Sequence, residues 1–179
     1  MTPRLEPPVF EDGPRAADGS ACEFVDGELR ERTMGMESTG IALAIGAEFR
    51  LWVKGRPIAW VFGSEGQYKC FAHAPERFRK PDVSVVLRER MPRRPRTMCL
   101  IAPDLVVEVV SPHDTAEEII ARLEDFRLAG TKLVLVAYPE QRRIFAHSPN
   151  ATKEFGPNDL LDVEPVLPGF SVRVAELFE

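Results

Sequence analysis

Two carboxylates stand inside runs of the sequence that are otherwise apolar. Asp82 opens the run PDVSVVL, and Glu108 lies among valines and a leucine in PDLVVEVV. An ionised carboxylate in such a strand carries a large desolvation cost unless it is paired, protonated or bound to a cation. Two hard oxygen donors, completed by a backbone carbonyl and water, suit Mg²⁺ or Mn²⁺. The sequence therefore supports the hypothesis of a divalent-metal site.

The alternation of side chains along a strand decides whether these two carboxylates can meet. It places Glu108 on one face with Val106 and Val110, and Asp82 on one face with Ser84. If the two strands are neighbours, the carboxylates converge on one cation.

Arg122 could add a positive charge to this site. Helical spacing places it beside Ile119 and Phe126, next to the core-facing stripe of a helix that begins just after the strand with Glu108. A guanidinium there could hold a scissile phosphate or stabilise its developing charge. Two alternatives stay open: an arginine whose stem covers the edge of the core, and a buried ion pair of Glu108 with Arg122 or Arg88.

Charge is unevenly distributed along a chain whose formal net charge is -5. Residues 76–96 hold eight bases against three acids, whereas residues 150–179 hold two bases against six acids. A basic segment of this kind attracts phosphate, although it can also be a solvated loop. On the first interpretation, the side chains expected to bind the substrate backbone are Arg88, Arg93, Arg94 and Arg96.

The elements that must position these residues can be read from periodicity and turn signals. Residues 1–20 read as a loose arm, and Asp26-Gly27 predicts a type I′ hairpin within CEFVDGELRERT. Helices are expected from Glu37 to about Lys54 and within residues 111–130, where Thr115 and Glu118 form a capping-box pair. The expected strands are IAWVFG, QYKCFA, PDVSVVL, PDLVVEVV, TKLVLVAYP and RRIFAHS.

Each expected helix carries an apolar stripe that should face a core. The stripe of the first helix consists of Ile41, Ala42, Ile45, Phe49, Leu51 and Trp52, and that of the second of Ala116, Ile119, Ile120, Leu123 and Phe126. Strands that alternate with helices predict an α/β fold on a mixed sheet, with a βαβ crossover around the second helix.

Length and composition set the class of protein. The 179 residues, 44% of them hydrophobic, are enough for one domain with its own core, here expected over residues 21–179. No run approaches the roughly 20 apolar residues of a membrane span, and the N-terminus lacks the apolar core of a signal peptide. Three cysteines argue against a disulfide framework or a zinc cage and fit a reducing cytoplasm.

The chain resembles the Uma-type restriction endonuclease family of the PD-(D/E)XK nuclease superfamily. The motifs occur in order: EFVDGEL, RKPDVSVV, APDLVVEVVSPHDT, the ARLEDF helix, and LLDVEPVLPGFSVRVAELF. The ordered set is specific, although each motif alone is weak. The resemblance implies a restriction-endonuclease-like αβββαβ core that cleaves phosphodiester bonds with Mg²⁺.

The same resemblance assigns roles to individual residues. Asp82 and Glu108 would be the two metal-ligating acids of the superfamily, and the Val109 carbonyl a third donor. Glu28, in the family's D-G-E element, is a candidate accessory acid in contact with substrate, with a surface role as its alternative.

Two positions depart from the family pattern. The superfamily's lysine would fall at Val110, and the family's helix lysine aligns with Arg122, which cannot lose a proton to act as a base. Ser38-Thr39 stands where the family tends to carry a histidine.

The first hypothesis is therefore a metal-dependent DNA endonuclease in which Asp82, Glu108 and Arg122 are catalytic. The alternative is a catalytically degenerate module of the same fold that binds nucleic acid or serves in assembly, and a third is a purely structural fold. Cutting both strands of a duplex needs two sites, which is compatible with a homodimer that nothing in the sequence requires.

Overall fold

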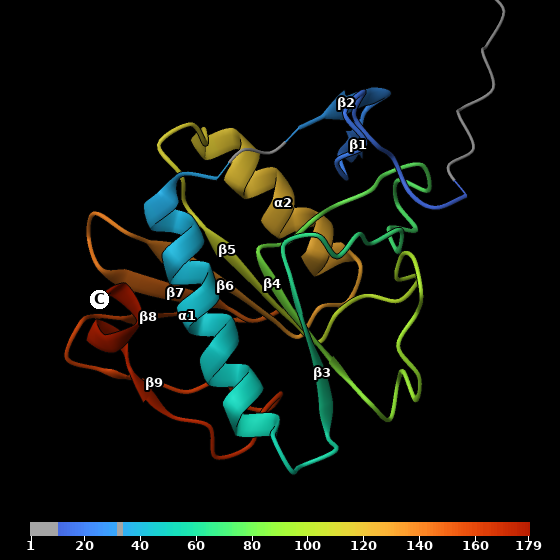
Figure 1. The fold of residues 1–179 in the computed structure, drawn as a ribbon. Helices are drawn as coiled ribbons and strands as arrows, with labels where there is room; N and C mark the ends of the chain where they lie inside the picture. Colours follow the sequence, from blue (N-terminus) through green and yellow to red (C-terminus); the bar gives the residue numbers. More distant parts are fainter. Residues whose placement is uncertain (1–10, 32–33) are drawn as a thin grey trace, which may run out of the picture.

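The fold is built on one six-stranded mixed sheet with a helix on each face. A computed structural model describes residues 11–31 and 34–179 of the chain. The strand order in the sheet is β3-β4-β5-β6-β7-β8, and Figure 1 shows α1 in front of this sheet and α2 behind it. This is the α/β architecture on a mixed sheet that the sequence pattern predicts, with the αβββαβ core that the family resemblance implies.

The elements follow one another along the chain with the following bounds: β1 (Glu23–Val25), β2 (Glu28–Arg30), α1 (Met36–Val53), β3 (Ala59–Gly63), β4 (Val83–Leu87), β5 (Leu105–Val109), α2 (Ala116–Leu128), β6 (Leu133–Tyr138), β7 (Arg143–His147), β8 (Thr152–Phe155), β9 (Leu160–Leu161), β10 (Val172–Arg173) and the 3₁₀ helix η1 (Val174–Phe178). β1 pairs with β2 and β9 with β10 in two small antiparallel sheets.

The candidate site lies at the centre of the sheet, where the N-terminal end of β4 adjoins the C-terminal end of β5. β4 runs antiparallel to β5, and β5 runs parallel to β6, with α2 as the connection between them. This confirms the predicted βαβ crossover. The capping box is formed as well, since Thr115 accepts from the backbone N–H of Glu118 while the Glu118 side chain accepts from the Thr115 N–H.

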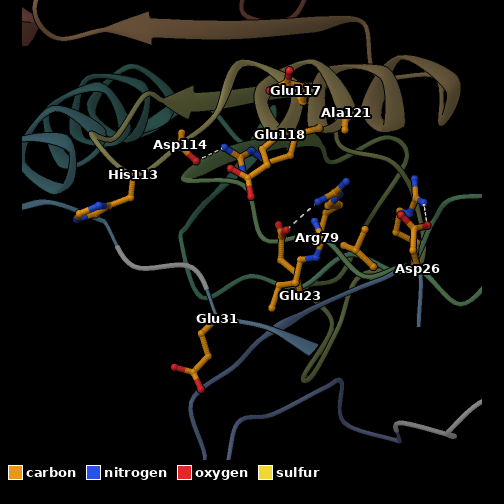
Figure 2. A pocket seen from close by; sticks show the side chains of 13 residues that line it. Glu23, Asp26, Glu31, Arg79, His113, Asp114, Glu117, Glu118 and Ala121 are labelled. Atoms are coloured by element: carbon orange, nitrogen blue, oxygen red, sulfur yellow. Dashed lines mark hydrogen bonds and ion pairs between the residues drawn. The ribbon is translucent and has the colours of Figure 1, made fainter. Parts of the chain in front are cut away.

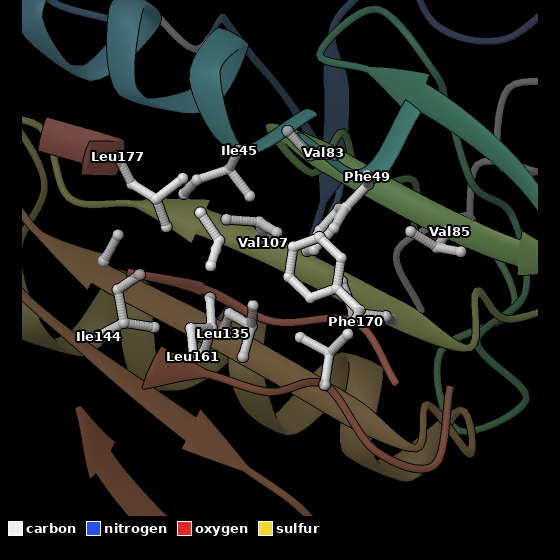
Figure 3. Packing of buried hydrophobic residues seen from close by; sticks show 14 of the residues in the cluster. Ile45, Phe49, Val83, Val85, Val107, Leu135, Ile144, Leu161, Phe170 and Leu177 are labelled. Carbon is white, nitrogen blue, oxygen red and sulfur yellow. The ribbon is translucent and has the colours of Figure 1, made fainter. Parts of the chain in front are cut away.

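Two hydrophobic clusters cover the two faces of the sheet. On one face α1, β9, β10 and η1 pack on the strands through residues such as Phe49, Val107 and Leu177, as Figure 3 shows. On the other face Phe126 of α2 packs with Val106 of β5. Side chains of β5 therefore alternate between the two layers, and Glu108 shares the α2 face with Val106.

Two sequence-based expectations about the elements are wrong. QYKCFA does not form a strand, because its backbone pairs only at isolated bridges from Tyr68 to Arg79 and to Cys99. Leu51 and Ile120, assigned to the apolar stripes, are 60% and 66% exposed. In α2 the stripe is completed instead by two charged residues, Arg122 and Asp125, whose side chains are buried.

The N-terminal segment is described from residue 11 onward. Pro14 is buried, and its carbonyl accepts a hydrogen bond of 2.8 Å from the side chain of Gln67. The division at residue 20 stays a prediction. Among the residues that the structure describes, no helix has the length and apolar character that a membrane crossing requires.

Candidate active site

Asp82 and Glu108 lie at adjoining ends of the two central strands. The β4–β5 ladder pairs Val83 with Val107, so one further step places Asp82 opposite Glu108. The Asp82 carboxylate accepts a hydrogen bond of 2.7 Å from the Val109 N–H. Both acids are buried, at 2% and 3% exposure. The register thus places on neighbouring strand ends two acids that are 26 positions apart in the sequence.

Arg122 reaches this site from α2. Its Nε lies 3.3 Å from Oε2 of Glu108, and its terminal nitrogen binds the carboxylate of Asp114. All three side chains are buried to more than nine-tenths. The guanidinium therefore stands between two acids, and the ion pair that the sequence offered as an alternative for Glu108 is present.

Asp114 belongs to this site although the sequence analysis did not single it out. It lies in the turn before α2, where its carboxylate also accepts a hydrogen bond of 2.8 Å from the Ser111 N–H. The turn therefore fixes the carboxylate, and the carboxylate fixes Arg122. The signal in the sequence is the SPHD turn itself, in which an aspartate three residues after a serine can close a turn through its side chain.

A pocket of about 290 Å³ opens beside Arg122. Figure 2 shows it between the first turns of α2, which carry Glu117 and Glu118, and Glu23 and Arg79 on the other side. Six acids and four arginines line it. With such a mixed lining, the pocket offers no general attraction for a polyanion, and the arginine nearest the carboxylate pair is Arg122.

Asp82 opens into a different cavity, of about 220 Å³, on the side of the N-terminal turn of α1. Its lining residues are Met34, Thr39, Ser64, Glu65, Lys80 and Asp82. Arg122 of α2 therefore lies on the Glu108 side of the carboxylate pair, and this cavity lies on the Asp82 side.

A buried network of charges holds the hairpin and α2 together next to the site. Arg79 donates to Glu23 at 2.8 Å and, through Nε, to Asp125 at 2.7 Å. Asp125 also contacts His73 at 2.9 Å and binds Arg77. The network connects β1, α2 and the segment before β4, and it fixes the walls of the pocket beside Arg122.

This network lowers the pKa of the Asp125 carboxyl. Burial by itself would raise that pKa, but the hydrogen bond with His73 and the charge and hydrogen bonds of Arg79 outweigh it, so the pKa lies below its ordinary value. A carboxyl whose pKa is depressed by folding contributes stability above its unfolded pKa of about 3.9, and this contribution is lost as the pH falls through the folded pKa.

We therefore expect the free energy of unfolding to fall below about pH 4, with Asp125 as one contributor. The Asp125→Asn variant should be less stable at pH 7 and should show a flatter dependence on pH between about pH 4 and pH 2. Urea unfolding at a series of pH values measures both. Equal slopes for the two proteins would contradict the role of Asp125.

The donor set fits a hard divalent cation. Among the described residues no group of three or more histidine, cysteine, aspartate or glutamate side chains could hold a metal ion. Mg²⁺, however, is commonly held by one or two carboxylates and keeps several waters. The Val109 C=O points to the same side of β5 as its N–H, which Asp82 binds, because both groups of a residue face the same neighbouring strand. The two carboxylates and this carbonyl are thus oxygen donors at the adjoining ends of β4 and β5, with the Glu108 side chain on the α2 face beside Arg122.

Other residues singled out in the sequence lie elsewhere. Glu28 is on the hairpin, 74% exposed at its side chain, and is not among the residues that line the pocket beside Arg122. The basic loop, residues 88–96, begins after the C-terminal end of β4, whereas Asp82 lies at the N-terminal end of that strand. Arg88 is six residues further along an extended chain than Asp82, a distance of about 20 Å.

The basic loop is nevertheless ordered around one tryptophan. The guanidinium carbons of Arg88 and Arg94 lie 3.6 and 4.8 Å from the centre of a Trp60 ring, and the Trp60 N–H donates to the Met91 carbonyl at 2.9 Å. These stacking contacts hold two of its positive charges in fixed positions. At this distance the loop can contact nucleic acid only away from the carboxylate pair.

Ser38 occupies the position at which the resemblance expects a histidine. Its hydroxyl donates to the Val110 carbonyl at 3.1 Å, so it fixes the chain just after β5. A serine there supports the strand that carries Glu108 but supplies no base.

Comparisons with known proteins agree with this architecture. The family model Uma2, described as "Putative restriction endonuclease", matches residues 8–175. A crystal structure of "a putative nuclease belonging to DUF820" from Anabaena variabilis ATCC 29413 is similar with a TM-score of 0.78 and 23% sequence identity, and the match covers 92% of each chain. At this identity the likeness shows the fold. A comparison with curated proteins found no match.

Proposed function

The chain belongs to the Uma2 family, described as "Putative restriction endonuclease", and on this premise we propose that it hydrolyses phosphodiester bonds of DNA with the help of Mg²⁺ or Mn²⁺. The observation that carries the proposal is the register that sets Asp82 opposite Glu108 at adjoining strand ends, with the guanidinium of Arg122 3.3 Å from Glu108. Two buried acids and one arginine at one point of a nuclease-like fold suit phosphoryl chemistry.

In this proposal, Asp82, Glu108 and the Val109 carbonyl would hold the cation. The ion would lower the pKa of a water molecule and neutralise charge on the phosphate. Arg122 contacts a non-bridging phosphate oxygen and stabilises the charge that develops there during in-line attack. Asp114 keeps the guanidinium oriented, since it binds the terminal nitrogen of Arg122.

A direct test is the nicking of supercoiled plasmid by the purified protein. We expect cleavage with Mg²⁺ or Mn²⁺ and none with EDTA. Mn²⁺ should also raise the melting temperature, because a ligand that binds only the folded protein stabilises it. Binding to DNA with no cleavage in either metal would reject the proposal. A comparison of DNA with RNA substrates defines the nucleic acid, and size-exclusion chromatography tests a homodimer.

One observation favours a second candidate, a non-catalytic nucleic-acid-binding module. Arg122 cannot give up a proton to act as a base, and it pairs with Glu108, one of the two acids that a cation would need. This candidate predicts DNA binding that weakens with salt and shows no turnover. A purely structural ion pair predicts instead no effect of Mn²⁺ on the melting temperature.

The Arg122→Lys variant separates these candidates. A lysine retains the positive charge and can act as a base after losing a proton, a contribution of about 100-fold or more in well-placed cases. If the protein is a nuclease limited by its arginine, kcat should rise by about 10- to 100-fold. In the variant, kcat should also increase as the pH rises through the pKa of the lysine. An unchanged lack of cleavage in a folded variant would favour the binding module.

A further inference from the structure

The cavity at Asp82 contains a lysine that neither the sequence analysis nor the family pattern assigned. Lys80 and Asp82 line the same cavity of about 220 Å³. From this placement we propose that Lys80 binds a backbone phosphate of the substrate, and that Glu65 occupies the anion position when no substrate is bound. The proposal rests on the proposed function, since it names the phosphate contact of that same site.

The position of the Lys80 ammonium is fixed by the fold. The side chain is only 8% exposed, and its Nζ donates to the Ala21 carbonyl at 2.6 Å. The Lys80 backbone N–H donates to Glu23 at 2.9 Å, so the buried charge network anchors this residue as well. A buried ammonium at a fixed position is pre-organised for an anion, because no long, flexible chain has to be ordered on binding.

Glu65, which pairs with the buried Lys80 ammonium, is itself exposed to solvent. Its Oε1 lies 3.0 Å from the Lys80 Nζ, yet its side chain is 75% exposed. An exposed carboxylate in an ion pair gains little from the contact and can turn into solvent at small cost. A phosphate of the substrate can therefore replace it on the ammonium, with the same charge sign and with more acceptor oxygens.

The size and lining of the cavity fit this exchange. A volume of 220 Å³ equals that of roughly seven waters, enough for a phosphate group with part of its hydration. Thr39 and Ser64 add hydroxyl groups to the wall. Since Asp82 lies in the same wall, a phosphate on Lys80 would be next to the carboxylate pair, whereas the basic loop lies at the far end of β4.

The test is the affinity for a fluorescein-labelled DNA duplex, measured by fluorescence anisotropy in EDTA over a range of salt concentrations. Glu65→Gln should bind about two- to fivefold tighter than the natural protein, since the competing carboxylate is gone. Lys80→Met should bind more weakly and should lower the slope of log K against log salt by about one, the loss of one phosphate contact. In the double variant the gain from Glu65→Gln should disappear, and Lys80→Arg should restore most of the slope.

Glu176→Gln is the matched control, since it removes the same charge from an exposed position on η1. Equal tightening by Glu65→Gln and Glu176→Gln, or an unchanged salt slope in Lys80→Met, would overturn the proposal. If Lys80→Met does not fold, the comparison of the two glutamine variants still decides it. Plasmid cleavage in Mg²⁺ is measured separately. Absent cleavage with the expected binding pattern rejects the nuclease and retains the phosphate site, and cleavage without that pattern rejects the site alone.

Discussion

Glu108→Gln is expected to lower the rate of plasmid cleavage about a thousandfold, because a metal-held charge at the phosphate is worth about 4 kcal/mol in the transition state. Glutamine has nearly the shape of glutamate, and Arg122 keeps its contact with Asp114. The loss of cleavage should come from the missing charge at the phosphate. Because Glu108 is also a buried partner of Arg122, the melting temperature should fall as well, so cleavage is compared at a temperature at which both proteins are folded. Single-turnover cleavage in Mg²⁺ provides the measurement.

Asp82→Asn should have an effect of the same size for the same reason. The amide oxygen can still accept the Val109 N–H, so the bond that joins the end of β4 to β5 is retained. Neither variant should show the rise in melting temperature that we expect Mn²⁺ to give the natural protein. Cleavage that persists at the natural rate in both variants would show that the activity comes from another site or from a contaminant.

Asp104 offers a control at the opposite end of the same two strands. It is fully buried, and its carboxylate accepts a hydrogen bond of 2.9 Å from the Leu87 N–H, much as Asp82 accepts from Val109. Asp104→Asn therefore makes the same chemical change at the other end of the strands, although Asp104 also pairs with Arg90 and Lys132, each at 3.0 Å, so the variant is also expected to be less stable. Its folded protein should retain the natural cleavage rate, which would tie the loss of activity to the end of the sheet that carries Asp82.

Arg79→Met should produce the largest loss of stability. The substitution removes the guanidinium that pairs with both Glu23 and Asp125; Asp125 keeps Arg77, whereas buried Glu23 loses its arginine. Removal of one partner from a buried ion pair costs about 3–5 kcal/mol. For a chain of this length the melting temperature should fall by roughly 6–20 °C. Calorimetry or urea unfolding at pH 7 measures the loss.

The matched control is Arg127→Met. Arg127 pairs with Glu124 on the surface of α2, with both side chains nearly half exposed. Such a pair contributes about 0–1 kcal/mol, so the melting temperature should change little. A comparable loss in both variants would show that burial of the network adds nothing to its stabilising effect.

The local elements could be predicted because their causes lie within a few residues. Asp26 and Gly27 both adopt positive φ, at 53° and 88°, as a type I′ turn requires, and Gly130 ends α2 with φ of 90°. The face shared by Val106 and Glu108 follows from strand alternation alone. QYKCFA was misread because a short apolar segment can fill a core from a loop, as Tyr68 does, without ladder pairing.

The partners of the charged residues could not be predicted in the same way. Arg79 meets Glu23 and Asp125 across 56 and 46 positions of sequence, and Lys80 meets the Ala21 carbonyl across 59. No turn or periodicity encodes such a contact. Asp125 was missed for this reason, since on the helix its sequence position gives no indication that two arginines and a histidine surround its carboxylate.

By itself, the sequence pattern determined an α/β fold on a mixed sheet, with Glu108 inside the central strand β5 and Asp82 directly before β4, because short-range backbone preferences and burial patterns set these features. The αβββαβ order of the core came from the family resemblance, since the pattern alone counted QYKCFA as a further strand. Only the tertiary structure decided which charges those acids face. The register of β4 on β5 brings Asp82 to Glu108, the crossover of α2 brings Arg122 to Glu108, and the packing of the segment before β4 brings Lys80 beside Asp82. These contacts depend on how distant parts of the chain pack, and that packing is a property of the whole fold.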